Sequence, residues 1–185
     1  MTVANMITMM RFILVPGVVF ALLTGENAWA FAGFVVAGVS DGVDGFVARQ
    51  FNQRTELGAY LDPMADKLLL VSVFVVFGFM GELPLWLVIL AVSRDALIIC
   101  AVLLSTVMGN PVEMRPFFVS KMNTAVQIVL SAIVLAELAF GPRLGMLREA
   151  LVYVCGLLTI ASAGAYLVAW SRHMKGYGEG EPSDD

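Results

Sequence analysis

Long apolar runs alternate with short breaks along almost the whole chain. Each run is close in length to the roughly 20 residues that an α-helix needs to cross a lipid bilayer. The chain shows no internal repeat and no heptad pattern. We therefore predict six membrane-spanning helices, at about residues 7–23, 29–48, 60–80, 85–107, 123–140 and 149–170.

The breaks between the runs contain residues that end helices. Glycine occurs in the breaks at 25–27, 81–84, 109–111 and 141–142, followed in three of them by proline. The first run has Arg11 near its start and Pro16 in its middle, and no small-residue cleavage site follows it, so we expect a retained helix and not a cleaved signal. Residues 1–172 are expected to form a single membrane domain, and residues 173–185 an acidic, disordered tail.

The composition agrees with a membrane protein. Of the 185 residues, 59% are hydrophobic and 14% are charged, whereas soluble domains have about 45–50% apolar and about 25% charged residues. This difference excludes a disordered protein, a collagen and an ordinary cytosolic enzyme. The net charge of −4 argues against nucleic-acid binding. Cys100 and Cys155 lie far apart in apolar runs, so no disulfide framework is predicted.

Basic residues between the runs fall mostly on one side of the predicted membrane. With six spans both termini share a side, and the opposite side holds only Arg143 and Arg148, since Lys67 and Arg94 lie within runs. Because short cytoplasmic loops are enriched in lysine and arginine, we predict that both termini are cytoplasmic. The basic residues on the terminal side are Arg11, Arg49, Arg54, Arg115, Lys121, Arg172 and Lys175.

Four aspartates gather where the second run ends and the third begins: Asp41, Asp44, Asp62 and Asp66. An acid at the centre of a bilayer costs about 2.5–3.5 kcal/mol, and less near the interface. Spacings of three and four residues place each pair of aspartates on one helix face. Because a short loop joins the two helices, we expect them to be antiparallel neighbours whose carboxylates converge.

Two interpretations of these aspartates are open. Too few basic residues lie nearby to neutralise all four carboxylates, and hard divalent cations prefer oxygen ligands, so a Mg²⁺ or Mn²⁺ site is favoured. The competing interpretation is a buried structural network of ion pairs.

Small and polar residues between the aspartates fit a phosphate-binding site. Gly45 and Ala48 each lie one helical turn after an aspartate and leave room for a bulky ligand. Arg49 continues the same stripe and can donate two hydrogen bonds to a diphosphate. Gly58 permits close approach to the helix, and Thr55 offers a hydroxyl. The small residues are equally compatible with ordinary packing between membrane helices.

Together these residues form the pattern Asp41-x2-Asp44-Gly45-x2-Ala48-Arg49-x8-Gly58-x3-Asp62-x3-Asp66. This pattern resembles the signature of the CDP-alcohol phosphotransferase family, with every fixed position matched. The segment from Asn5 to Arg11 is similar to the family's amino-terminal segment, although Ala4 stands where the family usually has proline. The resemblance extends over nearly the whole chain.

The resemblance implies an all-α integral membrane protein with six transmembrane helices, usually a homodimer, in the cell inner membrane or its equivalent. It implies phosphatidyl transfer from CDP-diacylglycerol to an alcohol, with release of CMP, at a site that faces the cytoplasm. Two divalent ions, Mg²⁺ or Mn²⁺, would be held by Asp41, Asp44, Asp62 and Asp66, and Asp66 would also be the general base. The residues implied to bind the CDP group are Gly45, Ala48, Arg49, Thr55, Gly58, Asn5 and Thr8.

Later segments bear on the alcohol acceptor. Residues 61–67 resemble the branch that contains phosphatidylglycerophosphate synthases and eukaryotic-type cardiolipin synthases. Residues 93–98 and 116–127 are similar to the cardiolipin synthases, and Asn123 stands where phosphatidylglycerophosphate synthases usually have a second lysine. The resemblance therefore favours phosphatidylglycerol as the acceptor and cardiolipin as the product. The alternative acceptor is glycerol 3-phosphate.

A divalent-cation transporter would also use clustered acids, although its site is expected near the bilayer midplane and with repeat symmetry.

Four charged residues outside the aspartate pattern allow more than one role. Arg94 and Asp95 either pair with charges on a neighbouring helix or contact the substrate. Lys121 is either a cytoplasmic loop cation or a substrate ligand. Glu137, deep in the fifth run, is protonated, paired or functional.

Overall fold

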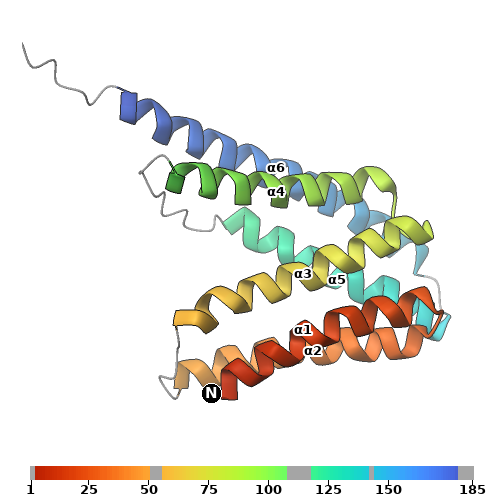
Figure 1. Cartoon of the computed structure of the whole chain (residues 1–185). Helices are drawn as coiled ribbons and strands as arrows, with labels where there is room; N and C mark the ends of the chain where they lie inside the picture. The colour runs from red at the N-terminus through yellow and green to blue at the C-terminus, as the bar shows by residue number, and fades with distance from the viewer. Residues whose placement is uncertain (1–2, 51–55, 108–117, 142–143, 179–185) are drawn as a thin grey trace, which may run out of the picture.

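The computed structural model describes residues 3–50, 56–107, 118–141 and 144–178, and within them the side chains of 10–40, 67–101, 104, 118–141 and 144–171. The described residues form helices and short turns (Figure 1), which confirms the all-α prediction for this part of the chain. The helices are α1 (Val3–Leu23), α2 (Asn27–Gln50), α3 (Glu56–Met80), α4 (Leu85–Val107), α5 (Phe118–Phe140) and α6 (Gly145–Gly178).

Successive helices run back and forth, so that alternate helix ends lie together. One end of the bundle holds the start of α1, the end of α2 and the start of α3, together with the end of α4 and the start of α5 (Figure 1). We name it the aspartate end, after the sequence pattern that α2 and α3 carry there. α1 packs against α2 and α3, α5 packs against α2 and α6, and α4 packs against α6.

A continuous apolar core joins the helices. Leu22 of α1, Phe77 of α3, Leu87 of α4 and Leu130 of α5 are fully buried in it. In a bilayer, close packing holds helices together, because lipid chains are as apolar as leucine. Gly156 of α6 allows such an approach: a Cβ atom added there would lie 2.8 Å from the ring of Trp86 on α4.

The described side chains show an inverted distribution of polarity. Large apolar side chains face outward, with Ile13 74%, Phe79 84% and Met146 89% exposed. Polar and charged side chains are buried inside the bundle instead, namely Arg11, Arg94, Asp95, Asn123, Gln127, Ser131, Glu137, Thr159 and Ser162. An apolar exterior of this extent is typical of a surface that meets lipid or another protein, and buried polar groups are typical of the interior of a membrane bundle.

Two helices among the described residues are long and apolar enough to cross a membrane, namely Phe118–Phe140 and Gly145–Ser171. Shorter apolar stretches occur at Met10–Leu23, Asn27–Ser40 and Lys67–Met80. These helices agree with a membrane protein. The number of spans and the side on which the termini lie stay predictions.

The predicted breaks end helices where the structure describes them. Gly25, Gly81 and Gly141 follow the ends of α1, α3 and α5 with φ angles of +80°, +76° and +85°. Glycine adopts this left-handed conformation without the steric cost of a Cβ atom, and it is common just after a helix. The predicted break at 109–111 lies outside the described residues.

Several helices extend beyond the apolar runs that predicted them. α6 begins at Gly145 and ends at Gly178, so the helix continues past residue 172, where the sequence placed the end of the domain. The helical part of the chain is therefore longer than predicted, and residues 179–185 lie outside the described residues.

Candidate active site

The helix ends place the predicted aspartates at one end of the bundle. Asp41 and Asp44 lie in the last three turns of α2, and Asp62 and Asp66 in the first three turns of α3. Both segments are continuous helix, so each pair shares a helix face as its spacing predicts. Their side chains are outside those described, and among the described side chains no group of three or more His, Cys, Asp or Glu could hold a metal.

The residues predicted to contact the CDP group lie near the same end. Gly45, Ala48 and Arg49 follow the aspartates in α2, Gly58 lies in the first turn of α3, and Asn5 and Thr8 lie at the start of α1. Thr55 lies outside the described residues. The backbone therefore gathers helix segments that carry six of the seven predicted CDP contacts at the aspartate end (Figure 1).

The packing of α2 and α3 differs from the prediction. In the part of the chain that the structure describes, α1 packs against both helices, and direct packing between α2 and α3 is not among the main helix contacts. The short loop between these helices suggested direct neighbours, but a loop fixes only where two helix ends meet. The two aspartate-bearing helices therefore share α1 as their common support.

A network of charged and hydroxyl groups lies just inside the aspartate end, where α3, α4, α5 and α6 approach one another. Asp95 accepts hydrogen bonds from Lys67 of α3 and from Nη1 of Arg94, the latter at 2.7 Å. Arg94 also donates to Ser162 of α6, from Nε at 3.1 Å and from Nη2 at 2.7 Å, and to Ser120 of α5. We name these five residues the Arg94 network.

The contacts of the network bear on the roles of Arg94 and Asp95. Both are buried, and both contact neighbouring helices, so they stabilise the packing of α4. The guanidinium carbon of Arg94 also lies 5.7 Å from the centre of the Tyr166 ring, a favourable cation–π distance.

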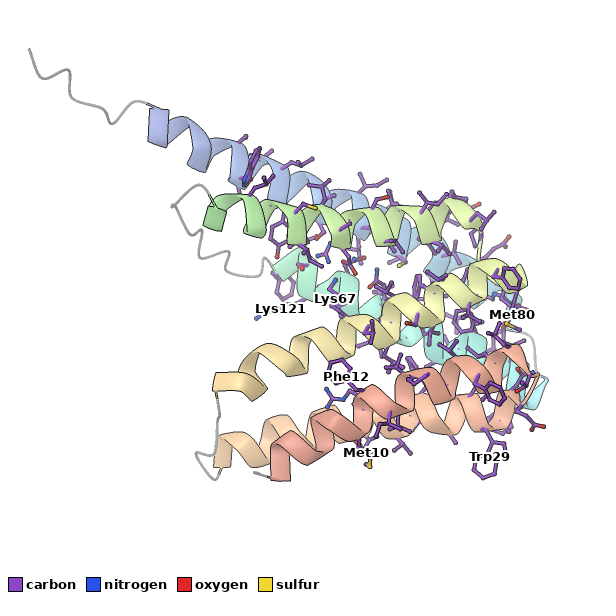
Figure 2. All side chains as sticks on the ribbon, in the orientation of Figure 1. Met10, Phe12, Trp29, Lys67, Met80 and Lys121 are labelled. Carbon is purple, nitrogen blue, oxygen red and sulfur yellow. The ribbon has the colours of Figure 1, made fainter. Side chains whose placement is uncertain are left out.

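Lys67 is the most exposed of the three charged members, with 39% of its side chain accessible. Lys67 and Lys121 lie in the same half of the bundle, whereas Trp29 and Met80 lie toward the opposite end (Figure 2).

A buried polar stripe continues from the network along α5. Asn123, Gln127 and Ser131 are spaced four residues apart on one helix face, and each is at most 4% exposed. Thr159 of α6 donates a hydrogen bond of 2.9 Å to Oδ1 of Asn123. The sequence reasoning did not place Gln127, Ser131, Thr159 and Ser162 in the interior, although polar residues at a spacing of four inside an apolar run are a usable signal.

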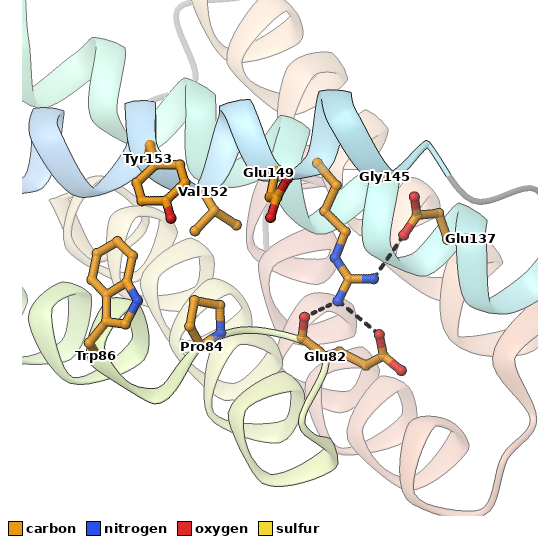
Figure 3. Close-up of a pocket in the computed structure, with 9 residues that line it drawn as sticks. Glu82, Pro84, Trp86, Glu137, Gly145, Glu149, Val152 and Tyr153 are labelled. Atoms are coloured by element: carbon orange, nitrogen blue, oxygen red, sulfur yellow. Dashed lines mark hydrogen bonds and ion pairs between the residues drawn. The ribbon is translucent and has the colours of Figure 1, made fainter.

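A cavity lies at the opposite end of the bundle from the aspartates. It has a volume of about 670 Å³ and lies among the α3–α4 connection, the end of α5 and the start of α6 (Figure 3). Arg148 crosses it and forms ion pairs of 2.9 Å with Glu82 and with Glu137. Glu137 also accepts a hydrogen bond from the backbone N–H of Leu144 at 2.6 Å. Of the three roles considered for Glu137, the structure therefore supports the paired one.

We expect Arg148→Met to destabilise the protein by about 3 kcal/mol, measured by thermal unfolding in detergent. The side chain of Glu137 is only 5% exposed, and loss of its cation leaves a buried carboxylate uncompensated. The double variant Arg148→Met/Glu137→Gln should recover part of the loss, because the amide carries no charge. A single variant within about 0.5 kcal/mol of the native protein would show that the ion pair has no structural role.

The described structure defines a class: a helical bundle with helices apolar enough to cross a membrane, whose aspartate pattern lies on two helix ends at one end of the bundle. The sequence profile of the family described as CDP-alcohol phosphatidyltransferase matches residues 1–166. The chain therefore belongs to the CDP-alcohol phosphatidyltransferase family, which is a family of phosphotransferase enzymes.

Curated relatives carry two kinds of name. The human protein named cardiolipin synthase (CMP-forming) is 33% identical over 181 residues, and the rat protein of that name is 32% identical over 181 residues; both cover 89% of this chain and 60% of the relative. A Mycobacterium tuberculosis protein named "Probable phosphatidylglycerophosphate synthase" is 36% identical over 100 residues, which is 50% of this chain and 47% of the relative. The chain thus spans between about half and three-fifths of the length of these relatives.

Proposed function

We propose that this protein transfers a phosphatidyl group from CDP-diacylglycerol to phosphatidylglycerol, which yields cardiolipin and CMP. The observation that carries the proposal is the family match over residues 1–166, which contains the complete aspartate pattern. We further propose a homodimer with six spans in the cell inner membrane or its equivalent. Both termini and the aspartate end would face the cytoplasm, where the water-soluble CMP can leave.

The donor set at the aspartate end fits two divalent metal ions. Four carboxylates originate from two helix ends that lie at the same end of the bundle, and carboxylate oxygens are the ligands that Mg²⁺ and Mn²⁺ prefer. Members of this family use divalent metal ions. Asp41, Asp44, Asp62 and Asp66 would hold them. Such ions would neutralise the diphosphate and the charge that develops on the departing CMP.

The chain's own residues would bind the donor and activate the acceptor. Asp66 takes the proton of the acceptor hydroxyl as its oxygen bonds to the phosphorus that carries diacylglycerol, and the bond from that phosphorus to CMP breaks. Arg49 holds the diphosphate, and the small residues let the donor lie against the helices. The residues assigned to the CDP group are Gly45, Ala48, Arg49, Thr55, Gly58, Asn5 and Thr8.

The charge of the Arg94 network supports a lipid acceptor. Lys67 and Arg94 both form ion pairs with Asp95, so one carboxylate offsets part of the positive charge of the two cations. Phosphatidylglycerol carries a single negative charge on its phosphodiester, whereas glycerol 3-phosphate approaches two. The human and rat relatives, which cover most of this chain, are named for cardiolipin synthesis.

A second candidate is transfer to glycerol 3-phosphate, which would make the protein a phosphatidylglycerophosphate synthase. The similarity over half of the chain to the M. tuberculosis protein of that name supports this candidate. The divalent-cation transporter has no comparable support, because the family is a family of enzymes.

The test is an acceptor panel with the purified protein in detergent, CDP-diacylglycerol and Mg²⁺, with products identified by mass spectrometry. We expect cardiolipin and CMP from phosphatidylglycerol, with a kcat/KM at least about tenfold above that for glycerol 3-phosphate, as expected for a site that binds one acceptor selectively. Turnover of glycerol 3-phosphate alone would identify the second candidate. No CMP release with any alcohol would reject both.

A further inference from the structure

Lys67 connects α3, which carries two of the four aspartates, to the helices on the other side of the bundle. Its ammonium group donates a hydrogen bond to the carboxylate of Asp95 on α4 and forms an ion pair with it. Among the side chains that the structure describes in α3, at residues 67–80, no other forms a hydrogen bond or an ion pair with another helix. In this part of the chain, the polar link between α3 and its neighbours is therefore concentrated at one residue.

The carboxylate that Lys67 binds is itself held in place. Asp95 is buried, and its Oδ1 also accepts a hydrogen bond of 2.7 Å from Nη1 of Arg94. Arg94 in turn donates to Ser162 of α6 and to Ser120 of α5. A contact with Asp95 therefore fixes α3 relative to α4, α5 and α6 together.

The packing around α3 is uneven. α3 packs mainly against α1, and to a much smaller extent against α4 and α5. Its described core side chains begin at Leu69 and Leu70 and continue away from the aspartate end. The pair between Lys67 and Asp95 lies at the border between this core and the turn that carries Asp66. It is thus the first described side-chain link from α3 to α4 beyond that turn.

The position of Lys67 determines the direction of Asp66. The two residues are consecutive in the continuous helix α3. With 3.6 residues per turn, consecutive side chains are related by a fixed rotation of about 100°, so a contact that fixes the rotation of α3 at Lys67 also fixes the Cα–Cβ direction of Asp66. A displacement of about 1 Å can cost about 100-fold in rate at a catalytic group.

We propose that the ion pair between Lys67 and Asp95 holds the turn of α3 that carries Asp66, which makes Lys67 a positioning residue for the proposed general base. This inference rests on the proposed function. Lys67 contacts neither substrate in this role. It fixes α3 against α4, while Asp66 accepts the proton of the acceptor hydroxyl.

Two substitutions of Lys67 test the role in the purified protein with CDP-diacylglycerol, phosphatidylglycerol and Mg²⁺. Lys67→Met keeps an apolar stem but cannot bind Asp95, and we expect its kcat for CMP release to fall by about 10- to 100-fold. Its Kd for CDP-diacylglycerol should stay within about twofold, because the loss concerns turnover and not binding. Arginine can still donate to a carboxylate, so Lys67→Arg should recover most of the kcat.

The melting temperature separates positioning from folding. Asp95 keeps Arg94 as a cation when Lys67 is replaced, so the buried carboxylate stays paired and Lys67→Met should melt close to the native protein. Thr159→Val is the matched control. It removes a buried hydrogen bond of 2.9 Å from α6 to Asn123 of α5, away from the Lys67 contact. This variant should melt lower and keep the native kcat.

A distance measurement tests the geometry without reference to activity. One spin label is attached to the exposed native Cys100 of α4 and a second to Glu56→Cys at the start of α3, while the buried Cys155 stays unlabelled. Pulsed electron spin resonance should give a narrow distance distribution in the native protein and a broader or shifted one in Lys67→Met. A control pair joins Cys100 to Met146→Cys on α6, where the native side chain is 89% exposed. Its distribution should not change.

Each remaining outcome is decisive. Native kcat in Lys67→Met, unchanged distances between α3 and α4, or a Lys67→Arg protein as slow as Lys67→Met would overturn the inference. A Lys67→Met protein that does not fold, or that melts below Thr159→Val, would assign the pair to folding instead. A Kd for CDP-diacylglycerol that rises as kcat falls would make Lys67 a substrate contact. A native protein that releases no CMP with any acceptor would reject the proposed function, whereas the distances still show whether the pair holds α3.

Discussion

Excess EDTA should abolish CMP release from CDP-diacylglycerol, and Mg²⁺ or Mn²⁺ in excess of the chelator should restore it. The reason is electrostatic: four aspartates at one end of the bundle repel one another and repel the diphosphate of the substrate, unless cations lie between them. The same reasoning predicts that Asp41→Asn and Asp62→Asn each lose more than about 100-fold in kcat, since even residues that only support metal ligands are worth 10- to 100-fold.

The controls for this prediction use the protein's other acids. Glu149 is exposed at the opposite end of the bundle, so Glu149→Gln should keep native activity and native metal dependence. Asp41→Asn and Asp62→Asn should elute from gel filtration as the native protein does, because removal of a repelling charge does not oppose folding. Full activity in excess EDTA would refute the assignment of the aspartates as metal ligands.

The helices could be predicted because their signal is local. An apolar run, followed by glycine and proline, marks a span whatever its neighbours are, and α1, α3, α4 and α5 end at the predicted residues Leu23, Met80, Val107 and Phe140. The starts of α1, α3, α5 and α6 were predicted four to five residues too late. A search for apolar runs detects only the part of a helix that suits lipid, whereas the backbone hydrogen bonds continue into polar turns beyond it.

The partners of the buried polar residues could not be predicted, because each pair joins distant parts of the chain. Arg94 contacts Ser162 across 68 residues, and Thr159 contacts Asn123 across 36. One sequence shows that Arg94 lies in an apolar run and needs a partner, but it does not show which helix faces it. The aspartate pattern was different, since its members lie on two consecutive helices and the chain itself brings their ends together.

The packing of α1 could not be predicted from the sequence either. The sequence placed α2 and α3 side by side on the basis of their short connection, but α1 packs against both in the described part of the chain. Arg11 of α1 is 1% exposed, so this helix brings a buried cation toward the half of the bundle that carries the proposed active site. Helix order along the chain therefore predicted which ends meet, and did not predict which faces pack.

Asp66→Asn should lower turnover by roughly 10²- to 10⁴-fold, the range expected for loss of a positioned general base. A primary alcohol is a weak nucleophile, so its proton must be accepted as it attacks. Asp66 lies one turn beyond Asp62 along α3, farther from the start of the helix. In the predicted orientation Asp66 is deeper in the bilayer, where we expect a lipid alcohol to approach. The next residue, Lys67, pairs with Asp95, so its ammonium group has a carboxylate partner of its own.

The competing interpretation is that Asp66 only binds metal, and the two roles predict different losses. If Asp66 is the general base, Asp66→Asn should have a much lower kcat, while its Kd for CDP-diacylglycerol, measured by calorimetry with Mg²⁺ present, stays within a few-fold of the native value. If Asp66 only binds metal, Asp66→Asn should lose affinity for metal and for nucleotide together. We expect this result for Asp62→Asn, which is the matched comparison on the same helix face. If Asp66→Asn binds neither metal nor CDP-diacylglycerol, or keeps near-native turnover, then another group must accept the proton of the attacking alcohol.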